Sequence, residues 1–203
     1  DTVSPMVATQ NITVYLDANG TASISAGMID NGSSDNCSVS SLALDVSSFT
    51  CSDVGANTVS LSATDASSNS TSAHAIVTVM DTISPNVQSQ NITVALDANG
   101  NASISTSDID DGSSDACGIA SMSLSNTSFT CADLGTNMLS LSVTDNNGNT
   151  ASSMATVTVV DNIAPSANTQ NITVYLDANG AASISAGMID NGSSDNCSVS
   201  SLA

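Results

Sequence analysis

The chain has 203 residues, of which 40% are hydrophobic and 2% are aromatic. It contains 19 acidic residues, all of them Asp, and no Lys or Arg, so its formal net charge is −19. Without basic side chains the chain has nothing to neutralise phosphates, and we expect it to bind neither nucleic acid nor anionic lipid by electrostatics. It contains no run of 18 apolar residues, so we expect no membrane insertion in this segment. With no basic side chains, a bound cation is the general source of positive charge that could balance these carboxylates.

The first strong feature is an internal repeat with a period of 80 residues, marked by the return of the sequence Asp1–Pro5 at residues 81–85 and 161–165. We predict two immunoglobulin-like repeats over residues 1–80 and 81–160, and an incomplete third repeat over residues 161–203. The third repeat matches the first at 36 of 43 positions. The partners that we expect are further copies of the repeat, in a longer chain or as strands donated by a neighbouring subunit of a filament.

Within each repeat the elements read as β-strands in chain order. Residues 11–16 alternate between apolar and polar side chains, and the tight turn Asp17–Gly20 follows. A second alternating segment covers residues 22–26. Further strands are predicted over residues 39–44, 59–63 and 75–79, with short segments around Phe49 and Cys51.

This pattern gives about seven strands per 80-residue repeat, with turn signals every 8 to 12 residues. It predicts an all-β fold of tandem immunoglobulin-like β-sandwich domains. Following the strand directions, residues 1–5, 30–36 and 65–70 gather at one end of the sandwich, which we call the entry end. The turn 17–20 and residues 45–57 gather at the opposite end, the exit end.

Disulfide bonds between the cysteines would stabilise a domain whose hydrophobic core is small. Cys37 and Cys51 are 14 residues apart, as are Cys117 and Cys131. This spacing predicts the disulfides Cys37–Cys51 and Cys117–Cys131, each closing a short loop and contributing roughly 3 kcal/mol, with Cys197 lacking a partner. Disulfides imply an oxidising compartment, so we expect a secreted, extracellular or cell-surface protein.

Aspartates recur at fixed positions of the repeat. Those of the entry end form carboxylate groups without a basic partner, and oxygen-only ligands of this kind suit Ca²⁺. We therefore predict Ca²⁺ sites at the entry ends, where domains meet. The predicted ligands are Asp1, Asp30, Asp35, Asp65, Asp81, Asp110, Asp111, Asp115, Asp145, Asp161, Asp190 and Asp195. For Asp17 and Asp53, at the exit end, a turn-capping role is favoured over metal binding.

Several motifs together resemble a known family. They are the Asn-Ile-Thr-Val-x-Leu-Asp-Ala-Asn-Gly segment, the loop of residues 110–118, Ser-Phe-Thr-Cys at residues 128–131 and the segment 143–149. The set resembles the HYR-like (hyalin-repeat-like) immunoglobulin-type repeats of large Bacteroidetes surface proteins. The resemblance implies an exported multi-domain stalk or adhesin. It also implies O-glycans at Asp-Thr followed by an apolar residue, which makes Thr2 and Thr82 candidate glycosylation sites.

We expect no enzymatic activity. His74 is the single His, and its counterpart in the second repeat is Met154. The pair Asp110–Asp111, which could imitate a carboxylate dyad, has Asp30–Asn31 as its counterpart. Two function classes remain. The first is a structural extracellular protein that forms a rigid stalk or filament, and the alternative is an adhesin that recognises glycans or other cells.

Overall fold

The structure, a computed structural model, describes residues 1–203 and confirms the all-β class, with 43% of the residues in strands and 9% in helices. The chain divides into two compact units. The first comprises Asp1–Asn86, Ser113–Met122 and Val143–Ala151, and the second comprises Val87–Gly112, Ser123–Ser142 and Ser152–Ala203. The first unit therefore contains the whole of repeat 1 together with residues 113–122 and 143–151 of repeat 2. These two segments include counterparts of the entry-end loops of repeat 1.

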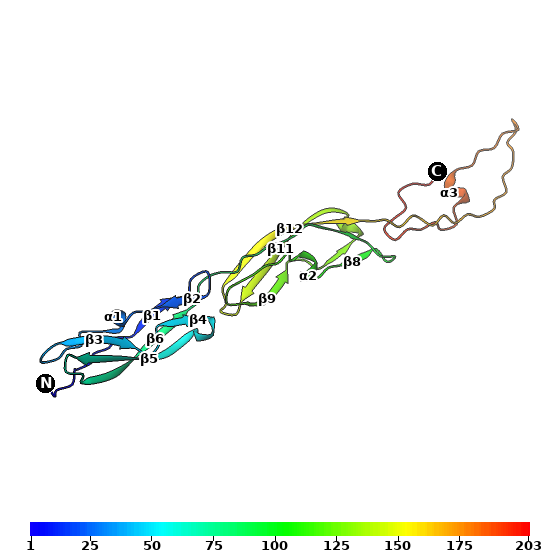
Figure 1. Ribbon diagram of the computed structural model, residues 1–203. Helices are drawn as coiled ribbons and strands as arrows, with labels where there is room; N and C mark the ends of the chain where they lie inside the picture. The colour runs from blue at the N-terminus through cyan, green and yellow to red at the C-terminus, as the bar shows by residue number, and fades with distance from the viewer. The chain divides into compact units, whose positions relative to one another are not determined.

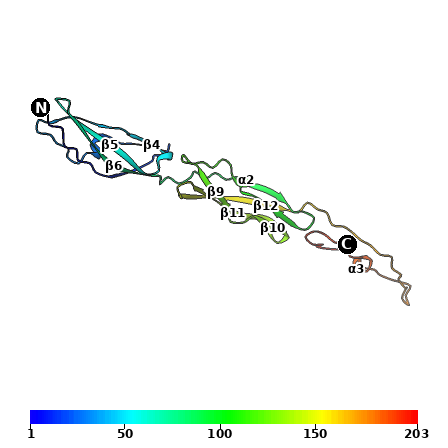
Figure 2. The ribbon, with the colours of Figure 1, turned by 90° about the horizontal axis from the view of Figure 1, so that it is seen from below.

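Repeat 1 is a sandwich of two sheets (Figure 1). The larger sheet has the order β1-β6-β5-β3, and the smaller sheet pairs β2 with β4. The long hairpin β5–β6 lies side by side in both views (Figures 1 and 2), while β1 runs parallel to β6 with Ile12 opposite Val77. The elements are β1 (Ile12–Tyr15), β2 (Thr21–Ser23), α1 (Ala26–Ile29), β3 (Val39–Leu44), β4 (Ser48–Thr50), η1 (Cys51–Asp53), β5 (Gly55–Asp65) and β6 (Ser70–Met80).

Repeat 1 thus has six strands where the sequence predicts about seven. The alternating segment ends at Ser23, and Ala26 begins the one-turn helix α1 instead of continuing a strand. The short segment at Cys51 is a 3-10 turn, closed by Asp53, whose carboxylate accepts hydrogen bonds from the backbone and the hydroxyl of Thr50. A side chain that caps the local backbone in this way favours a turn over a sheet ladder.

The core of repeat 1 follows the period of two that the sequence shows. Val59, Leu61 and Ala63 of β5 are fully buried, and the intervening Ser and Thr side chains are not. Phe49 of β4 closes the core from the smaller sheet. Because each strand exposes one face and buries the other, a thin sandwich of small side chains is sufficient to cover both inner faces.

Residues 81–160 repeat the same arrangement with strand orders β7-β12-β11-β9 and β10-β8. Leu139, Leu141, Val157 and Phe129 occupy the buried positions. The elements are β7 (Ile92–Ala95), β8 (Asn101–Ser103), α2 (Thr106–Ile109), β9 (Ile119–Leu124), β10 (Ser128–Thr130), η2 (Cys131–Asp133), β11 (Gly135–Asp145) and β12 (Thr150–Val160).

Residues 161–203 carry the helix α3 (Ala186–Ile189) and no strand (Figure 1). Two isolated bridges, Ser166 to Ser194 and Thr169 to Asp190, hold this segment locally. Val174 and Leu176 are exposed, whereas their counterparts in repeat 1 are buried in the core with the residues of β5 and β6. None of the helices of the structure has the length and hydrophobicity needed to cross a membrane.

Candidate cation sites and inter-repeat disulfides

The entry end of repeat 1 brings three carboxylates together. Asp1, Asp35 and Asp65 each place an oxygen within 4.8 Å of the others. Asp65 is only 3% exposed and ends β5, where Asn69 donates its side-chain amide at 2.7 Å and its backbone N–H at 2.8 Å. The side-chain hydrogen bond from Asn69 is the main reason why the pKa of Asp65 lies below its ordinary value.

The same amide of Asn69 anchors the incoming chain, because it also donates to the backbone carbonyl of Asp1 at 3.2 Å. The Oδ1 atom of Asp35 is buried and has no hydrogen-bond partner. A buried carboxylate oxygen without a donor or a counter-charge is costly. The chain has no Lys or Arg that could supply one, so this oxygen is a candidate cation ligand.

Asp30, predicted to belong to the same site, lies outside this group of three. Its carboxylate accepts the backbone N–H of Ser33 at 3.0 Å, and its own backbone N–H closes the turn of α1 on Ala26. The side chain of Ser33 contributes most to the lowered pKa of Asp30. Asp190 makes the same contact with Ser193 at 2.9 Å. This position of the repeat therefore caps a loop.

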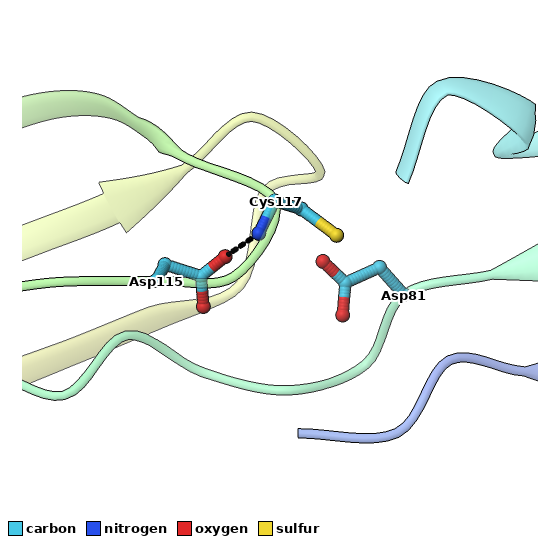
Figure 3. Close-up of side chains that lie close together, drawn as sticks. All are labelled: Asp81, Asp115 and Cys117. Carbon is cyan, nitrogen blue, oxygen red and sulfur yellow. Dashed lines mark hydrogen bonds between the residues drawn. The ribbon is translucent and has the colours of Figure 1, made fainter. Parts of the chain in front are cut away.

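In repeat 2 the group consists of Asp81, Asp115 and Cys117, all in the first compact unit. Figure 3 shows the carboxylate of Asp81 facing the sulfur of Cys117, while Asp115 accepts the backbone N–H of Cys117 at 2.8 Å. Asp81 is 8% exposed, and its Oδ2 atom is buried without a partner. Its Oδ1 accepts the backbone N–H of Ile83 at 3.0 Å.

Asp145, the counterpart of Asp65, is 1% exposed and is held by protein donors. The backbone N–H groups of Asn147 and Asn149 donate to Oδ1, and the amide of Asn149 donates to Oδ2, each at 2.8 Å. Burial raises the pKa of this carboxyl, but these hydrogen bonds outweigh it and leave the pKa below its ordinary value. The carboxylate of Asp145 is therefore already hydrogen-bonded to protein donors and has no unpaired oxygen to offer a cation.

The remaining predicted ligands lie elsewhere. The structure does not place Asp110 and Asp111 in the group of Asp81. In residues 161–203, Asp161 accepts the N–H of Ile163, and Asp195 accepts the N–H of Cys197 at 3.0 Å while its Oδ2 is buried without a partner. The turn residue Asp17 accepts from the backbone of Asn19 and Thr21, as its predicted capping role requires.

The predicted disulfide pairing was wrong. The structure joins Cys51 to Cys117 and Cys131 to Cys197, each across 66 residues, and leaves Cys37 free and exposed. Each bond therefore connects the exit end of one repeat to the entry end of the next. Both bonds lie within a compact unit, the first in unit 1 and the second in unit 2.

The physical reason is the strand between the two cysteines of a repeat. β3 separates Cys37 from Cys51 with six residues, which is roughly 20 Å of extended chain at about 3.3 Å per residue. The Cα atoms of a disulfide must lie within about 7 Å of each other. The bonded pair Cys51 and Cys117 has a Cα–Cα distance of 5.1 Å. The strand directions carry this information, because they place Cys51 at the exit end and Cys37 directly after the entry-end loop 30–36.

The exit-end turn is shaped around the disulfide. Gly20 has φ +73°, and a Cβ atom on it would lie 2.6 Å from the sulfur of Cys51. Gly100 repeats this geometry at Cys131, where the carbonyl of Asn196 also approaches within 2.8 Å of the same position. Cys51 and Cys117 both pack against the core of repeat 1. A residue of repeat 2 thus extends the apolar cluster of repeat 1.

The ligand atoms of the group in repeat 2 determine which cation fits it. The sulfur of Cys117 is engaged in the disulfide and is not a thiolate ligand, so the group offers the carboxylates of Asp81 and Asp115. These are hard oxygen ligands with no His or free thiolate among them. Such a set fits Ca²⁺, which accepts irregular oxygen shells, better than Zn²⁺. The unpartnered Oδ2 of Asp81 is the atom that such an ion would satisfy.

The chain resembles several solved structures, each at low sequence identity. No family model matches the chain, and no curated protein matches it in sequence. The extracellular cadherin domains 1–4 of protocadherin gamma B7 are 9% identical, covering 84% of this chain and 54% of that one, with a TM-score of 0.38. Domains EC22–24 of mouse cadherin-23 are 13% identical over 77% of this chain and 67% of that one, with a TM-score of 0.38.

The titin domains z1z2, in a complex with telethonin, are 12% identical over 80% of this chain and 100% of that one, with a TM-score of 0.32. The chain spans about half the length of the protocadherin structure named above. These values describe a similarity of fold.

Proposed function

We propose that this chain is a structural segment of an extracellular tandem-repeat protein, a stalk or filament whose successive repeats are locked end to end by disulfides and by Ca²⁺ at the entry ends. The observation that carries the proposal is the pairing of Cys51 with Cys117 and of Cys131 with Cys197. Both bonds join neighbouring repeats with the same separation. A bond that served one domain alone would not cross the repeat boundary.

The covalent links favour a load-bearing role. Each bond closes a loop of 66 residues, for which the chain-entropy model gives a stabilisation of about 4 kcal/mol. Under tension a closed loop cannot extend, so each bond removes roughly 230 Å of extensible chain at about 3.5 Å per residue. Force applied to the ends would pass through the disulfides and bypass most of the backbone of both loops.

The carboxylate groups support the Ca²⁺ part of the proposal. Asp81 and Asp115 lie beside the disulfide Cys51–Cys117 in the same unit, and the chain contains no basic residue to offset them. A cation there would offset the repulsion between buried carboxylates and fix the linker that enters repeat 2. The group Asp1, Asp35 and Asp65 repeats this chemistry at the first entry end.

The disulfides also support secretion, because such bonds persist in oxidising compartments. Membership of the HYR-like repeats of Bacteroidetes surface proteins rests on the motifs of the sequence and is part of this proposal. Thr2 and Thr82 are both exposed and stay candidate sites for O-glycans. Adhesion to glycans remains the alternative function, for which Tyr15, 59% exposed, is the available stacking surface in repeat 1.

Stretching single molecules from their two ends tests the proposal. We expect the contour length after full unfolding to increase by roughly 230 Å per disulfide when a reducing agent is added. The double variant Cys51→Ser with Cys117→Ser is the matched control and should show the increase for one bond only. Equal contour lengths before and after reduction would contradict the proposed inter-repeat links.

A further inference from the structure

The disulfide Cys51–Cys117 lies directly beside two carboxylates. The ligand atoms of Asp81, Asp115 and Cys117 all lie within 4.8 Å of one another, and the sulfur of Cys51 is bonded to that of Cys117. Figure 3 shows the carboxylate of Asp81 facing the sulfur of Cys117. All four residues belong to the first compact unit. We call them the junction group; it contains two sulfurs, which the disulfide keeps from acting as thiolate ligands.

Asp81 supplies the observation that points to a bound ion. Its side chain is 8% exposed, and its Oδ2 atom is buried without a hydrogen-bond partner. A buried carboxylate oxygen without a partner is costly, and the chain has no Lys or Arg to offset its charge. Reduction of the disulfide would add two ionisable thiols beside this oxygen. Repulsion within such a group favours either protonation or the binding of a cation.

The backbone already has a spacing that two ligands of one ion can use. The Cα atoms of Cys51 and Cys117 are 5.1 Å apart. Two sulfurs bound to one tetrahedral Zn²⁺ at about 2.3 Å lie about 3.8 Å from each other. A Cβ atom on Gly20 would lie 2.6 Å from the sulfur of Cys51 and 3.6 Å from that of Cys117. Because Gly20 leaves this position empty, the two sulfurs have room to separate by side-chain rotation.

The reduced junction group has the ligand set of a zinc site. Two thiolates and two carboxylates provide four ligands, the number that Zn²⁺ takes in structural sites. Thiolates select Zn²⁺ over Ca²⁺, whereas carboxylates alone suit the harder ion. Asp115 is held beside the sulfur, because its Oδ1 accepts the backbone N–H of Cys117 at 2.8 Å. The state of one sulfur–sulfur bond therefore decides which class of ion the junction group suits.

We propose that the junction group is a redox-controlled metal site that binds Zn²⁺ when its disulfide is reduced, through Cys51, Asp81, Asp115 and Cys117. A phosphine reductant breaks the bond: its phosphorus gives up an electron pair and takes the oxygen of one water molecule, whose two protons leave the cysteines as thiols. Zn²⁺ then displaces both thiol protons as it binds. Exchange with a small disulfide, which leaves as two thiolates, re-forms the bond and releases the ion. The inference uses the inter-repeat disulfide of the proposed function but not its Ca²⁺.

The experiment uses the full chain with Cys37→Ser, Cys131→Ser and Cys197→Ser, so that Cys51 and Cys117 are its only cysteines. The chain is reduced with the phosphine under an inert atmosphere and titrated with Co²⁺, whose thiolate charge-transfer band and visible bands report sulfur ligation in a tetrahedral site. We expect one Co²⁺ per chain, displaced by Zn²⁺, and a higher melting temperature of the reduced chain with Zn²⁺ than without it. The same chain before reduction should show no thiolate band.

Substitutions at the carboxylates test whether the cysteines act alone. Asp81→Asn and Asp115→Asn should each weaken Zn²⁺ binding at least about tenfold, since the loss of even an outer-shell partner costs this much. Asp111→Asn, changed at an exposed residue outside the group, is the matched control and should bind Zn²⁺ as the parent does. Circular dichroism of the variants before reduction checks that they are folded.

Three results would overturn the inference: no thiolate band with Co²⁺, one ion shared between two chains, or equal affinities in the parent and both Asp variants. A reduced chain that unfolds and takes up no ion would do the same. A peptide map of the unreduced native chain reports the Cys51–Cys117 link independently. Its absence would contradict the proposed function, whereas its presence without metal binding after reduction would contradict only the zinc site.

Discussion

Asn149 donates its side-chain amide both to the carboxylate of Asp145 at 2.8 Å and to the backbone carbonyl of Asp81 at 3.3 Å. One amide thus donates to a carboxyl that is 1% exposed and also holds the linker that leads into repeat 2. Asn69 makes the equivalent pair of contacts with Asp65 and Asp1. The entry ends of repeats 1 and 2 are organised around this Asn.

Replacing Asn149 by Ala should destabilise the protein by about 1–3 kcal/mol, because the buried carboxylate of Asp145 loses a donor. The exposed Asn147 offers a matched control, since the structure uses its backbone N–H but shows no hydrogen bond from its side chain. Chemical denaturation of Asn149→Ala and Asn147→Ala measures the difference. Equal losses of unfolding free energy in the two variants would contradict the role assigned to Asn149.

Acid should lower the free energy of unfolding by protonating Asp145. The pKa of this carboxyl in the folded state lies below its ordinary value of 3.8, so its ionised form stabilises the fold above that pH. This contribution is lost as the pH falls through the lowered folded pKa. The difference in unfolding free energy between the native chain and Asp145→Asn should be constant near neutral pH and should shrink below pH 3.8. A difference that grows on acidification would show the opposite sign of the pKa shift.

Replacing Gly20 by Ala should disturb the junction at the disulfide. The new Cβ would lie 2.6 Å from the sulfur of Cys51 and must also adopt φ +73°. Gly32 is the matched control, because it has φ +88° with no atom within 4 Å of a Cβ at that position. Both variants bear the cost of the left-handed conformation, but Gly20→Ala should lose about 1–3 kcal/mol more. Thermal unfolding measures this, and equal melting temperatures would argue against the close approach.

Ca²⁺ should raise the melting temperature, and a chelator should reverse the effect, because binding to the folded state alone stabilises it. Asp81→Asn should abolish most of the response at the junction, since it removes the charge from the unpartnered Oδ2 atom. Asp111→Asn, changed at an exposed residue outside the group, should retain the response. Calorimetry with Ca²⁺ measures the affinity. No heat of binding and an unchanged melting temperature in chelator would contradict the site.

The sequence was sufficient to predict the sandwich because its period of two is strong where the core is continuous. Val59, Leu61 and Ala63 alternate with polar residues, and all three are buried as expected. The gathering of Asp1, Asp35 and Asp65 followed from strand direction alone. Asp30 could not be separated from that group, because whether a carboxylate caps its own loop depends on local backbone geometry that a residue pattern does not contain.

The predicted disulfide pairing is wrong because a short spacing along the chain does not imply closeness in space. Cys37 and Cys51 are separated by a full strand, whereas Cys51 and Cys117 are brought together by the repeat boundary. Strand direction carries this information and would have predicted the bond. The close approach of Gly20 to Cys51, by contrast, depends on the positions of two loops and had no sequence signal beyond the turn itself.

The two disulfide loops also determine how the chain responds to a break in its backbone. Cys51–Cys117 and Cys131–Cys197 each enclose their own stretch of chain, and the two stretches do not overlap. A single peptide bond cleaved anywhere inside either loop leaves its two fragments covalently joined through sulfur. One hydrolytic cut per loop therefore leaves the chain continuous from end to end. A chain of this kind keeps its ends connected after proteolytic damage that would sever a string of domains without such bonds.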